Sequence, residues 1–142
     1  MTVQDILQSK GGQVVSVAPG DTIGNVARVL ADRRIGAVLV REEGKVVGVF
    51  SERDVVRGLA RHGAQALERP VSDLMTREVI TCKPAETVHD VMERMTARRI
   101  RHLPVLDNGQ LTGIVSIGDL VKARIEEAER EASDLREYIK AG

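Results

Sequence analysis

The sequence repeats itself at a distance of 65 residues. Residues 14–56 align with residues 79–121 without a gap, and an Arg-Arg-Ile triplet at 33–35 falls on the same triplet at 98–100. Two copies with so long a period indicate two similar halves rather than a solenoid of many short repeats. A half of about 60 residues is marginally stable alone. We therefore expect the two halves to pack together about a pseudo-twofold axis.

A short lead-in precedes each copy. Residues 3–7 read Val-Gln-Asp-Ile-Leu and correspond to residues 71–75, which read Val-Ser-Asp-Leu-Met, at an offset of 68. The first copy therefore has three extra residues near Gly11-Gly12-Gln13. This pattern predicts a first motif at 1–62, a connector at 63–70, a second motif at 71–125 and a C-terminal helical extension at 126–142.

Each copy predicts the element order β-α-β-β-α. Residues 14–17 and 79–82 are short strand candidates, because they are rich in β-branched residues and end just before a proline. Thr22 and Thr87 are plausible helix N-caps, since the apolar residues after each follow the i, i+3, i+4, i+7 spacing of an amphipathic helix.

A hairpin follows the first helix of each copy. Its strands are predicted at 37–40 and 46–50, and again at 103–106 and 111–115, where the Asn-Gly pair between them is a strong tight-turn signal. These runs are apolar at nearly every residue, so both faces of the sheets are expected to be covered. The fold class is therefore α/β, with two β-α-β-β-α motifs and a C-terminal helix.

Composition excludes several function classes. Charged residues make up 30% and hydrophobic ones 42%, as in a soluble globular protein, and no apolar run approaches the ~20 residues of a membrane span. The 21 basic residues equal the 21 acidic ones, so no basic field exists to hold nucleic acid. With Phe50 and Tyr138 as its only aromatic residues, the chain lacks base-stacking surfaces. We expect a cytoplasmic protein that binds neither nucleic acid nor membranes.

The most specific motif is Gly-h-x-Ser-x-x-Asp, where h is apolar. It occurs at 48–54 and at 113–119, where a strand becomes a helix. Free N–H groups at a helix N-terminus suit a phosphate, and the Ser hydroxyl adds a donor. An Asp in the first turn can accept hydrogen bonds from ribose hydroxyls. The Gly would let the backbone approach closely. A second interpretation stays open, because a Ser followed three residues later by an acid also resembles a capping box.

Other chemistry-bearing residues give weaker signals. His62, His89 and His102 have no metal-ligand spacing with each other or with Cys82, so no metal site is predicted. Cys82 aligns with Val17, which favours a buried small hydrophobe over a nucleophile. No nucleophile elbow, P-loop or zinc-protease motif is present, and we expect no enzymatic activity.

Taken in order, these motifs resemble a tandem pair of CBS domains, modules named after cystathionine β-synthase. The resemblance rests on Arg-Arg-Ile-Gly-Ala at 33–37, on Arg-Arg-Ile-Arg-His-Leu-Pro-Val at 98–105, and on the two Gly-h-x-Ser-x-x-Asp motifs. It covers about residues 3–125. The chain is similar to stand-alone bacterial two-CBS proteins of signal transduction and regulation.

The resemblance implies two clefts between the halves and adenosine-containing ligands: AMP, ADP, ATP, NAD(H) or S-adenosylmethionine. It implies that Asp54 and Asp119 hold ribose and that Ser51 and Ser116 support phosphate. It further implies that backbone near the first and second strands meets adenine, which here means Val15, Ser16, Gly36 and Ala37 in one cleft and Ile80, Thr81, His102, Leu103 and Pro104 in the other.

The two copies differ where phosphates would lie. Arg53 has Gly118 as its counterpart, which gives the first cleft an extra cation. Arg101 and His102 stand where the first copy has Gly36 and Ala37; they would either clamp phosphates or fill the second cleft. We therefore rank the first cleft ahead of the second. Lys10 is either another phosphate contact or a solvated loop lysine.

The tail has a separate pattern. Six apolar residues alternate spacings of four and three, the rhythm of a coiled-coil seam: Val121, Ile125, Ala128, Ala132, Leu135 and Ile139. This pattern favours contact with a second copy of the chain, and the alternative is a helix that packs on its own domain.

Together these observations predict a non-enzymatic sensor that binds an adenine nucleotide, forms a homodimer and acts on an unidentified effector protein. The alternatives are a ligand-free dimerisation or partner-binding scaffold, and a thiol enzyme that uses Cys82.

Overall fold

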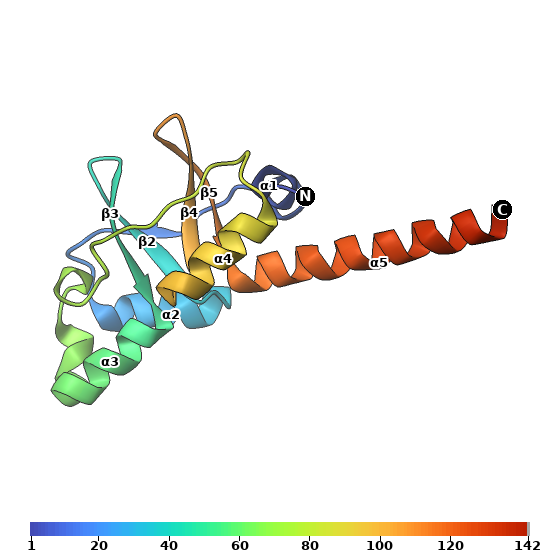
Figure 1. The fold of residues 1–142 in the computed structure, drawn as a ribbon. Coiled ribbons are helices and arrows are strands. Elements are labelled where there is room, and N and C mark those ends of the chain that lie inside the picture. The colour runs from blue at the N-terminus through green and yellow to red at the C-terminus, as the bar shows by residue number, and fades with distance from the viewer. Residues whose placement is uncertain (142) are drawn as a thin grey trace. The chain divides into compact units, whose positions relative to one another are not determined.

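The computed structural model describes residues 1–141, and these form two compact units (Figure 1). The first-copy unit consists of residues 14–80. The second-copy unit consists of residues 1–13 together with the chain from Thr81 onward. Each unit contains one copy of the repeat, but the lead-in of each copy belongs to the other unit.

The first-copy unit is a three-stranded sheet with helices packed on it. The strands follow the order β1-β2-β3, with β1 parallel to β2 and β2 antiparallel to β3. The predicted β-α-β-β-α order is confirmed here, and two 3₁₀ helices follow it. The elements are β1 (Ser16–Val17), α2 (Ile23–Arg33), β2 (Ala37–Glu42), β3 (Lys45–Ser51), α3 (Glu52–His62), η1 (Gly63–Glu68) and η2 (Val71–Asp73).

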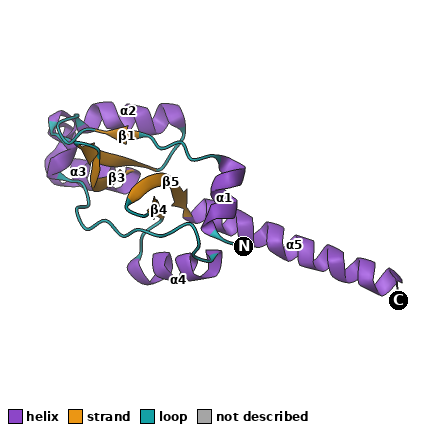
Figure 2. Ribbon diagram, turned by 90° about the horizontal axis from the view of Figure 1, so that it is seen from above, coloured by secondary structure: helices purple, strands orange, loops and turns teal. Residues whose placement is uncertain are grey.

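The second-copy unit has the same helices and hairpin, with a further helix at its start and a long one at its end (Figure 2). Its sheet consists of one antiparallel pair, β4-β5. The elements are α1 (Val3–Lys10), α4 (Val88–Arg98), β4 (His102–Asp107), β5 (Gln110–Ser116) and α5 (Ile117–Ala141).

The predicted first strand of the second copy is reduced to one parallel bridge, between Cys82 and Val105. The two copies differ in one backbone donor. In the first-copy unit, the N–H of Leu39 donates to the carbonyl of Val15 at 3.2 Å. Pro104 stands at the position equivalent to Leu39 and has no N–H, so the matching bond does not exist in the second copy.

The helix boundaries follow from local sequence. Thr22 accepts a hydrogen bond from the backbone N–H of Asn25 at 3.2 Å, and Thr87 accepts one from Asp90 at 3.1 Å, which confirms both predicted N-caps. The residue after each of these helices adopts the left-handed conformation, with φ of 54°. This turn of the backbone ends each helix within the Arg-Arg pair.

The hairpin turns also follow from local sequence. Asn108 and Gly109 have φ values of 51° and 82°, and both belong to the left-handed region that a tight two-residue turn requires. Glu43 and Gly44 form the corresponding turn of the first copy, with φ values of 52° and 78°. The predicted Asn-Gly turn is confirmed, and the first copy adopts the same geometry with a less favourable residue at its first position.

Each lead-in is attached to the repeat of the other copy by equivalent backbone bonds. In the second-copy unit, the N–H of Val3 donates to the carbonyl of Glu86 at 3.0 Å. In the first-copy unit, the N–H of Val71 donates to the carbonyl of Asp21 at 2.8 Å. The apolar side chains of the second lead-in, Val71 and Met75, belong to the core that Phe50 and its neighbours form.

The glycine of each Gly-h-x-Ser-x-x-Asp motif makes room for a lead-in side chain. A Cβ at Gly48 would lie 2.6 Å from the sulfur of Met75, and a Cβ at Gly113 would lie 2.7 Å from Cδ2 of Leu7. The expectation that these glycines also serve a close approach of backbone to ligand stays a prediction. The absent side chain is needed for packing inside each unit.

Candidate functional site

The first-copy candidates gather where the sheet meets α3. Ala37 lies opposite Ser51 in the register of β2 and β3, and the N–H of Glu52 donates to the carbonyl of Gly36 at 3.0 Å. Val15 and Ser16 lie on the neighbouring β1 side of the same sheet, where Ser16 pairs with Leu39. The strand pairing thus brings residues about 40 positions apart in the sequence to one corner of one unit. Their role in nucleotide binding stays a prediction.

Asp54 is the buried carboxylate of this corner, with only 5% of the residue exposed. Its Oδ2 accepts hydrogen bonds from the backbone N–H of Ser51 at 2.9 Å and from the Ser51 hydroxyl at 3.2 Å. Its Oδ1 lies 3.8 Å from a guanidinium nitrogen of Arg57. Burial raises the pKa of Asp54 above its ordinary value, and the two Ser51 hydrogen bonds act in the opposite direction.

The helix-start contacts of Asp54 use one of its two oxygens, and its ligand role stays a prediction. Oδ2 performs the reciprocal contact with Ser51 that a capping box requires. An ionised carboxylate offers about four acceptor positions over its two oxygens. The helix-start role consequently leaves acceptor capacity on Oδ1. Arg53, the residue before Asp54, is exposed at the same helix start.

Asp119 occupies the equivalent corner of the second-copy unit, but it has an additional partner. Its Oδ2 accepts from the backbone N–H of Ser116 at 2.9 Å, and its own N–H donates to the Ser116 hydroxyl at 3.1 Å. The ammonium of Lys10 donates to the same Oδ2 at 2.7 Å and to the carbonyl of Ile114 at 3.0 Å. Lys10 is therefore the last residue of α1 and the ion-pair partner of Asp119, not a loop lysine, and its role as a phosphate contact stays a prediction.

The Lys10 contact gives Asp119 a pKa shift opposite in direction to that of Asp54. Burial alone would raise the pKa of Asp119, but the hydrogen bonds from Lys10 and Ser116 and the charge of Lys10 outweigh it and lower the pKa below the ordinary value. The lead-in alignment at offset 68 places Glu78 at the position of Lys10. The first-copy unit thus carries the opposite charge at the corresponding place in the lead-in that it contains.

A second internal contact engages the predicted adenine-facing backbone of the second copy. The Arg94 guanidinium donates to the carbonyl of Thr81 at 3.0 Å and forms a two-pronged ion pair with Glu86. Val29 is the counterpart of Arg94 in the first copy and has no donor. The Thr81 carbonyl is therefore already occupied by a contact that the first copy cannot make at Ser16.

The remaining second-copy candidates are divided. Arg101 uses its carbonyl to accept from the N–H of Ile117 at 2.8 Å, as Gly36 does in the first copy, and His102 pairs with Ser116 across the hairpin. Pro104 is buried in β4. Ile80 ends the first-copy unit, whereas the other second-copy candidates belong to the second-copy unit.

Cys82 is unsuited to nucleophilic chemistry. It is 2% exposed, and burial, with a smaller contribution from Glu86, raises the pKa of its thiol to about 12. A thiol with this pKa is almost entirely protonated at neutral pH, and the thiolate is the reactive form. The interpretation of Cys82 as a buried small hydrophobe is supported.

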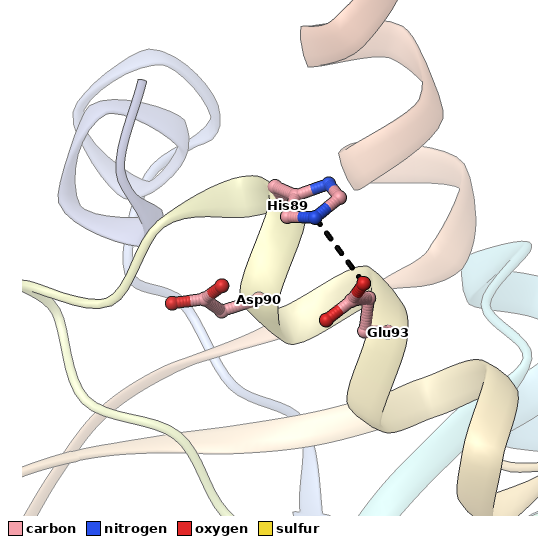
Figure 3. Close-up of side chains that lie close together, drawn as sticks. All are labelled: His89, Asp90 and Glu93. Atoms are coloured by element: carbon pink, nitrogen blue, oxygen red, sulfur yellow. Dashed lines mark ion pairs between the residues drawn. The ribbon is translucent and has the colours of Figure 1, made fainter.

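A group of possible metal ligands lies at the start of α4. The ligand atoms of His89, Asp90 and Glu93 all lie within 4.8 Å of one another (Figure 3). The sequence interpretation missed this group because it compared the histidines with each other and with Cys82; the His-x-x-x-Glu spacing on a helix is the signal that would have found it. All three residues are exposed, and His89 and Glu93 already form an i,i+4 ion pair at 3.3 Å.

Each unit of the described chain, residues 1–141, contains a groove. One, between α2 and η1, contains none of the predicted nucleotide-binding residues. The other runs between α1 and α5 and includes Lys10 and Asp119, together with the α5 side chains of Ala123, Glu127, Arg130 and Asp134. Within residues 1–141, no helix combines the length and the apolar character that crossing a bilayer requires.

The fold defines a two-motif α/β protein. The last helix of each motif carries a capping carboxylate, Asp54 or Asp119, in its first turn. The CBS-domain family model matches residues 3–61 and 71–126. The chain therefore belongs to the CBS-domain family, as the sequence motifs predict.

Solved structures agree with this assignment. The CBS-domain containing protein ATU1752 from Agrobacterium tumefaciens is 47% identical with a TM-score of 0.86, over 87% of this chain and 99% of that one. The protein PAE2072 from Pyrobaculum aerophilum, complexed with AMP, is 32% identical with a TM-score of 0.73, over 84% and 89% of the two chains. The CBS pair of protein MJ0100, complexed with 5′-methylthioadenosine and S-adenosyl-L-methionine, is 26% identical with a TM-score of 0.79, over 89% and 98%.

Proposed function

We propose that this chain is a regulatory module that binds an adenosine nucleotide at the Asp54 corner of the first-copy unit. AMP, ADP, ATP and NAD(H) are the candidate ligands. The observation that carries the proposal is the state of the carboxylate: Asp54 is buried, Ser51 orients its Oδ2, and its Oδ1 retains acceptor capacity. A buried acceptor held in a fixed direction suits the paired hydroxyls of a ribose.

The start of α3 supplies the complementary phosphate chemistry. The N-terminus of a helix carries a partial positive charge and unpaired N–H groups, which favour an anion. Arg53 adds a full positive charge to the first turn of α3 and is exposed there. A nucleotide with its ribose on Asp54 would therefore meet positive potential on its phosphate side.

Relatives support the adenosine part of the proposal. The AMP complex of PAE2072 and the 5′-methylthioadenosine and S-adenosyl-L-methionine complex of MJ0100 contain three different ligands. These three ligands share an adenosine core and differ in what is attached to its 5′ position. We therefore expect adenine and ribose to determine recognition and the phosphates to tune affinity.

The second-copy corner is proposed as the weaker site. A ligand that bound Asp119 would compete with the Lys10 ammonium, which lies 2.7 Å from the same carboxylate. A base that approached the Thr81 carbonyl would compete with Arg94. Both competing groups belong to the chain itself. A ligand would have to displace them before it binds, which lowers its affinity.

A regulatory role requires that the nucleotide change the protein's equilibrium. A ligand shifts two conformations only by as much as it binds them unequally, so output would pass through an effector protein or through the geometry of a dimer. The alternative function is a scaffold that dimerises or binds a partner with its corners empty. These two functions differ in whether a nucleotide stabilises the fold.

Calorimetric titration of nucleotide-free protein with AMP, ADP, ATP, NAD(H) and S-adenosylmethionine tests the proposal, with GMP as the matched control. We expect adenosine ligands to bind and to raise the melting temperature, since ligand at ~100 Kd adds about 2.7 kcal/mol to the unfolding free energy. Equal effects of GMP and AMP would indicate phosphate capture without base recognition. No effect from any ligand would favour the scaffold.

A further inference from the structure

The long helix α5 leaves its apolar face uncovered. Its buried residues, Leu120 and Ala123, lie in its first two turns. Farther along, Ile125 is 54% exposed, Leu135 is 60% exposed and Ile139 is 67% exposed. In Figures 1 and 2 the helix runs on past the other elements of the second-copy unit. Large aliphatic side chains on an exposed helix indicate a surface that another element covers.

The uncovered residues form one stripe, which we call the tail seam: Val121, Ile125, Ala128, Ala132, Leu135 and Ile139. All six are exposed, although the helix is continuous from Ile117 to Ala141. Their alternating spacing of four and three keeps them on one side of the helix.

The second-copy unit itself uses a different side of α5. The α5 side chains that line the groove between α1 and α5 include Ala123, Glu127, Arg130 and Asp134, and also Lys122 and Glu131. The first four occupy positions c and f of a heptad in which the tail seam supplies a and d, so they lie on the face away from the seam, whereas Lys122 and Glu131 lie at e and g beside it. The alternative of a helix that packs on its own domain therefore accounts for the other face of α5 and leaves the tail seam without a partner in the unit.

Charges beside the tail seam specify what covers it. The e positions of the heptad are Lys122, Glu129 and Arg136, and the g positions are Arg124, Glu131 and Tyr138. In a parallel two-stranded coiled coil, each g residue faces the e residue five positions later on the other helix. Arg124 then faces Glu129 of the partner subunit, and Glu131 faces Arg136 of the partner subunit. Both contacts pair opposite charges, and symmetry doubles them.

An antiparallel arrangement that overlaps all six layers of the tail seam would bring like charges together. It places g against g and e against e, so Glu131 meets Glu131 of the partner subunit and Glu129 meets Glu129 of the partner subunit. Lys122 meets Arg136 of the partner subunit. These are like-charge contacts, which oppose association. Antiparallel registers shifted by one heptad relieve the repulsion but overlap only four of the six layers.

We propose that the tail seam pairs with the tail seam of a second copy of this chain, in a parallel and in-register two-stranded coiled coil. Ala128 and Ala132 form the two central layers, where small side chains allow close approach, and the larger aliphatic residues form the layers on both sides. This surface lies outside the Asp54 corner, so the proposal is independent of the proposed nucleotide site.

Cysteine cross-linking of the full chain tests the geometry. In the proposed dimer, position 135 lies opposite itself, so Leu135→Cys should form a disulfide-linked dimer under copper–phenanthroline oxidation. Glu137→Cys is the control, because position 137 faces away from the seam and should stay unlinked. Cys82 is 2% exposed and should not contribute in either variant. Failure of Leu135→Cys to link, or equal linking of both variants, would overturn the proposal.

A charge exchange provides a second test that leaves the apolar layers intact. Glu131→Lys should weaken association roughly tenfold in sedimentation measurements, because it turns two attractive contacts into repulsive ones. Adding Arg136→Glu to the same chain should restore the original affinity. Glu137→Lys changes the net charge equally and should leave association unchanged. An intact chain that is monomeric at tens of micromolar, or a double variant without rescue, would contradict the parallel seam.

Discussion

The Asp54 corner and the Asp119 corner have the same motif and different surroundings. Both carboxylates accept the backbone N–H of the Ser three residues earlier at 2.9 Å. Asp54 is buried with a raised pKa, whereas Asp119 is one-quarter exposed in its side chain, paired with Lys10 and lowered in pKa. A duplicated motif thus retains its helix-start geometry in both copies, while the contact between Lys10 and Asp119 comes from outside the motif.

The largest expected effect is on nucleotide affinity. Asp54→Ala should weaken binding by about 1.5–3 kcal/mol, or roughly ten- to a hundredfold in Kd, because the carboxylate would lose its hydrogen bonds to ribose. Asp119→Ala should have a smaller effect. Calorimetric titration of both variants, together with their melting curves without ligand, measures this difference. Loss of about 1 kcal/mol of apo stability with unchanged affinity would show that Asp54 is only a helix-start residue.

The second largest expected effect is on stability, where alanine at the two motif glycines should have different costs. Gly48→Ala brings a Cβ within 3.0 Å of the carbonyl oxygen of Thr76, whose backbone is held by its bridge to Val49, besides meeting Met75. Gly113→Ala meets the flexible end of Leu7. We expect losses of about 2 and about 1 kcal/mol in unfolding free energy, measured by urea denaturation.

The control for the two glycines is Gly20→Ala, whose added Cβ would have no neighbour within 4 Å. It should leave the unfolding free energy nearly unchanged. If Gly113→Ala proved the more damaging of the pair, the lead-in of the first-copy unit would be the more adaptable one, contrary to this comparison.

Removing the Lys10 charge should make the two corners more alike. Lys10→Gln should cost up to about 1 kcal/mol in unfolding free energy, because the ion pair is only partly shielded from solvent. It should also raise nucleotide binding at Asp119, which calorimetry would detect as a stoichiometry that moves from one towards two. Lys45→Gln removes the same charge from the exposed first residue of β3 and should change neither quantity. An unchanged stoichiometry would mean that Lys10 does not limit the second corner.

The smallest effect is a difference in pH dependence. The raised pKa of Asp54 means that its stabilising contribution is present below its unfolded pKa and is lost as pH rises through its folded pKa. The lowered pKa of Asp119 has the opposite consequence: its contribution is present above its unfolded pKa and is lost as pH falls through its folded pKa. At neutral pH the first carboxylate is therefore a cost and the second a gain.

Isosteric amides measure this contrast. Near pH 7, Asp54→Asn should leave the unfolding free energy unchanged or raise it by a few tenths of a kcal/mol, since the amide oxygen still accepts from Ser51. Asp119→Asn should lower it by about 1 kcal/mol. As pH falls, Asp54→Asn should converge towards the parent protein first, below the unfolded pKa of Asp54, whereas Asp119→Asn should converge only below the lowered folded pKa of Asp119. If Asp54→Asn lost more unfolding free energy than Asp119→Asn at neutral pH, Asp54 rather than Asp119 would be the stabilising carboxylate.

The sequence by itself determined the elements that depend on neighbouring residues. The threonine N-caps, the helices after them and the Asn108-Gly109 turn were predictable, because hydrogen bonds three residues apart and positive φ angles are local properties. The repeat then carried these predictions from one copy to the other, and it placed the Ser-Asp pairs at the starts of α3 and α5. Pro104 also carries a local signal, although its consequence for the preceding strand became clear only beside Leu39.

Only the tertiary structure decided which distant groups meet. Lys10 and Asp119 are 109 residues apart, and Arg94 reaches Thr81 across the helix start. The exchange of lead-ins, which brings Leu7 to Gly113 and Met75 to Gly48, is equally absent from local sequence. The physical reason is that spacing and propensity fix the conformation of a segment, whereas the partner of a side chain depends on the path of the whole chain. The two Ser-Asp motifs were therefore predicted as equivalents, and their surroundings made them different.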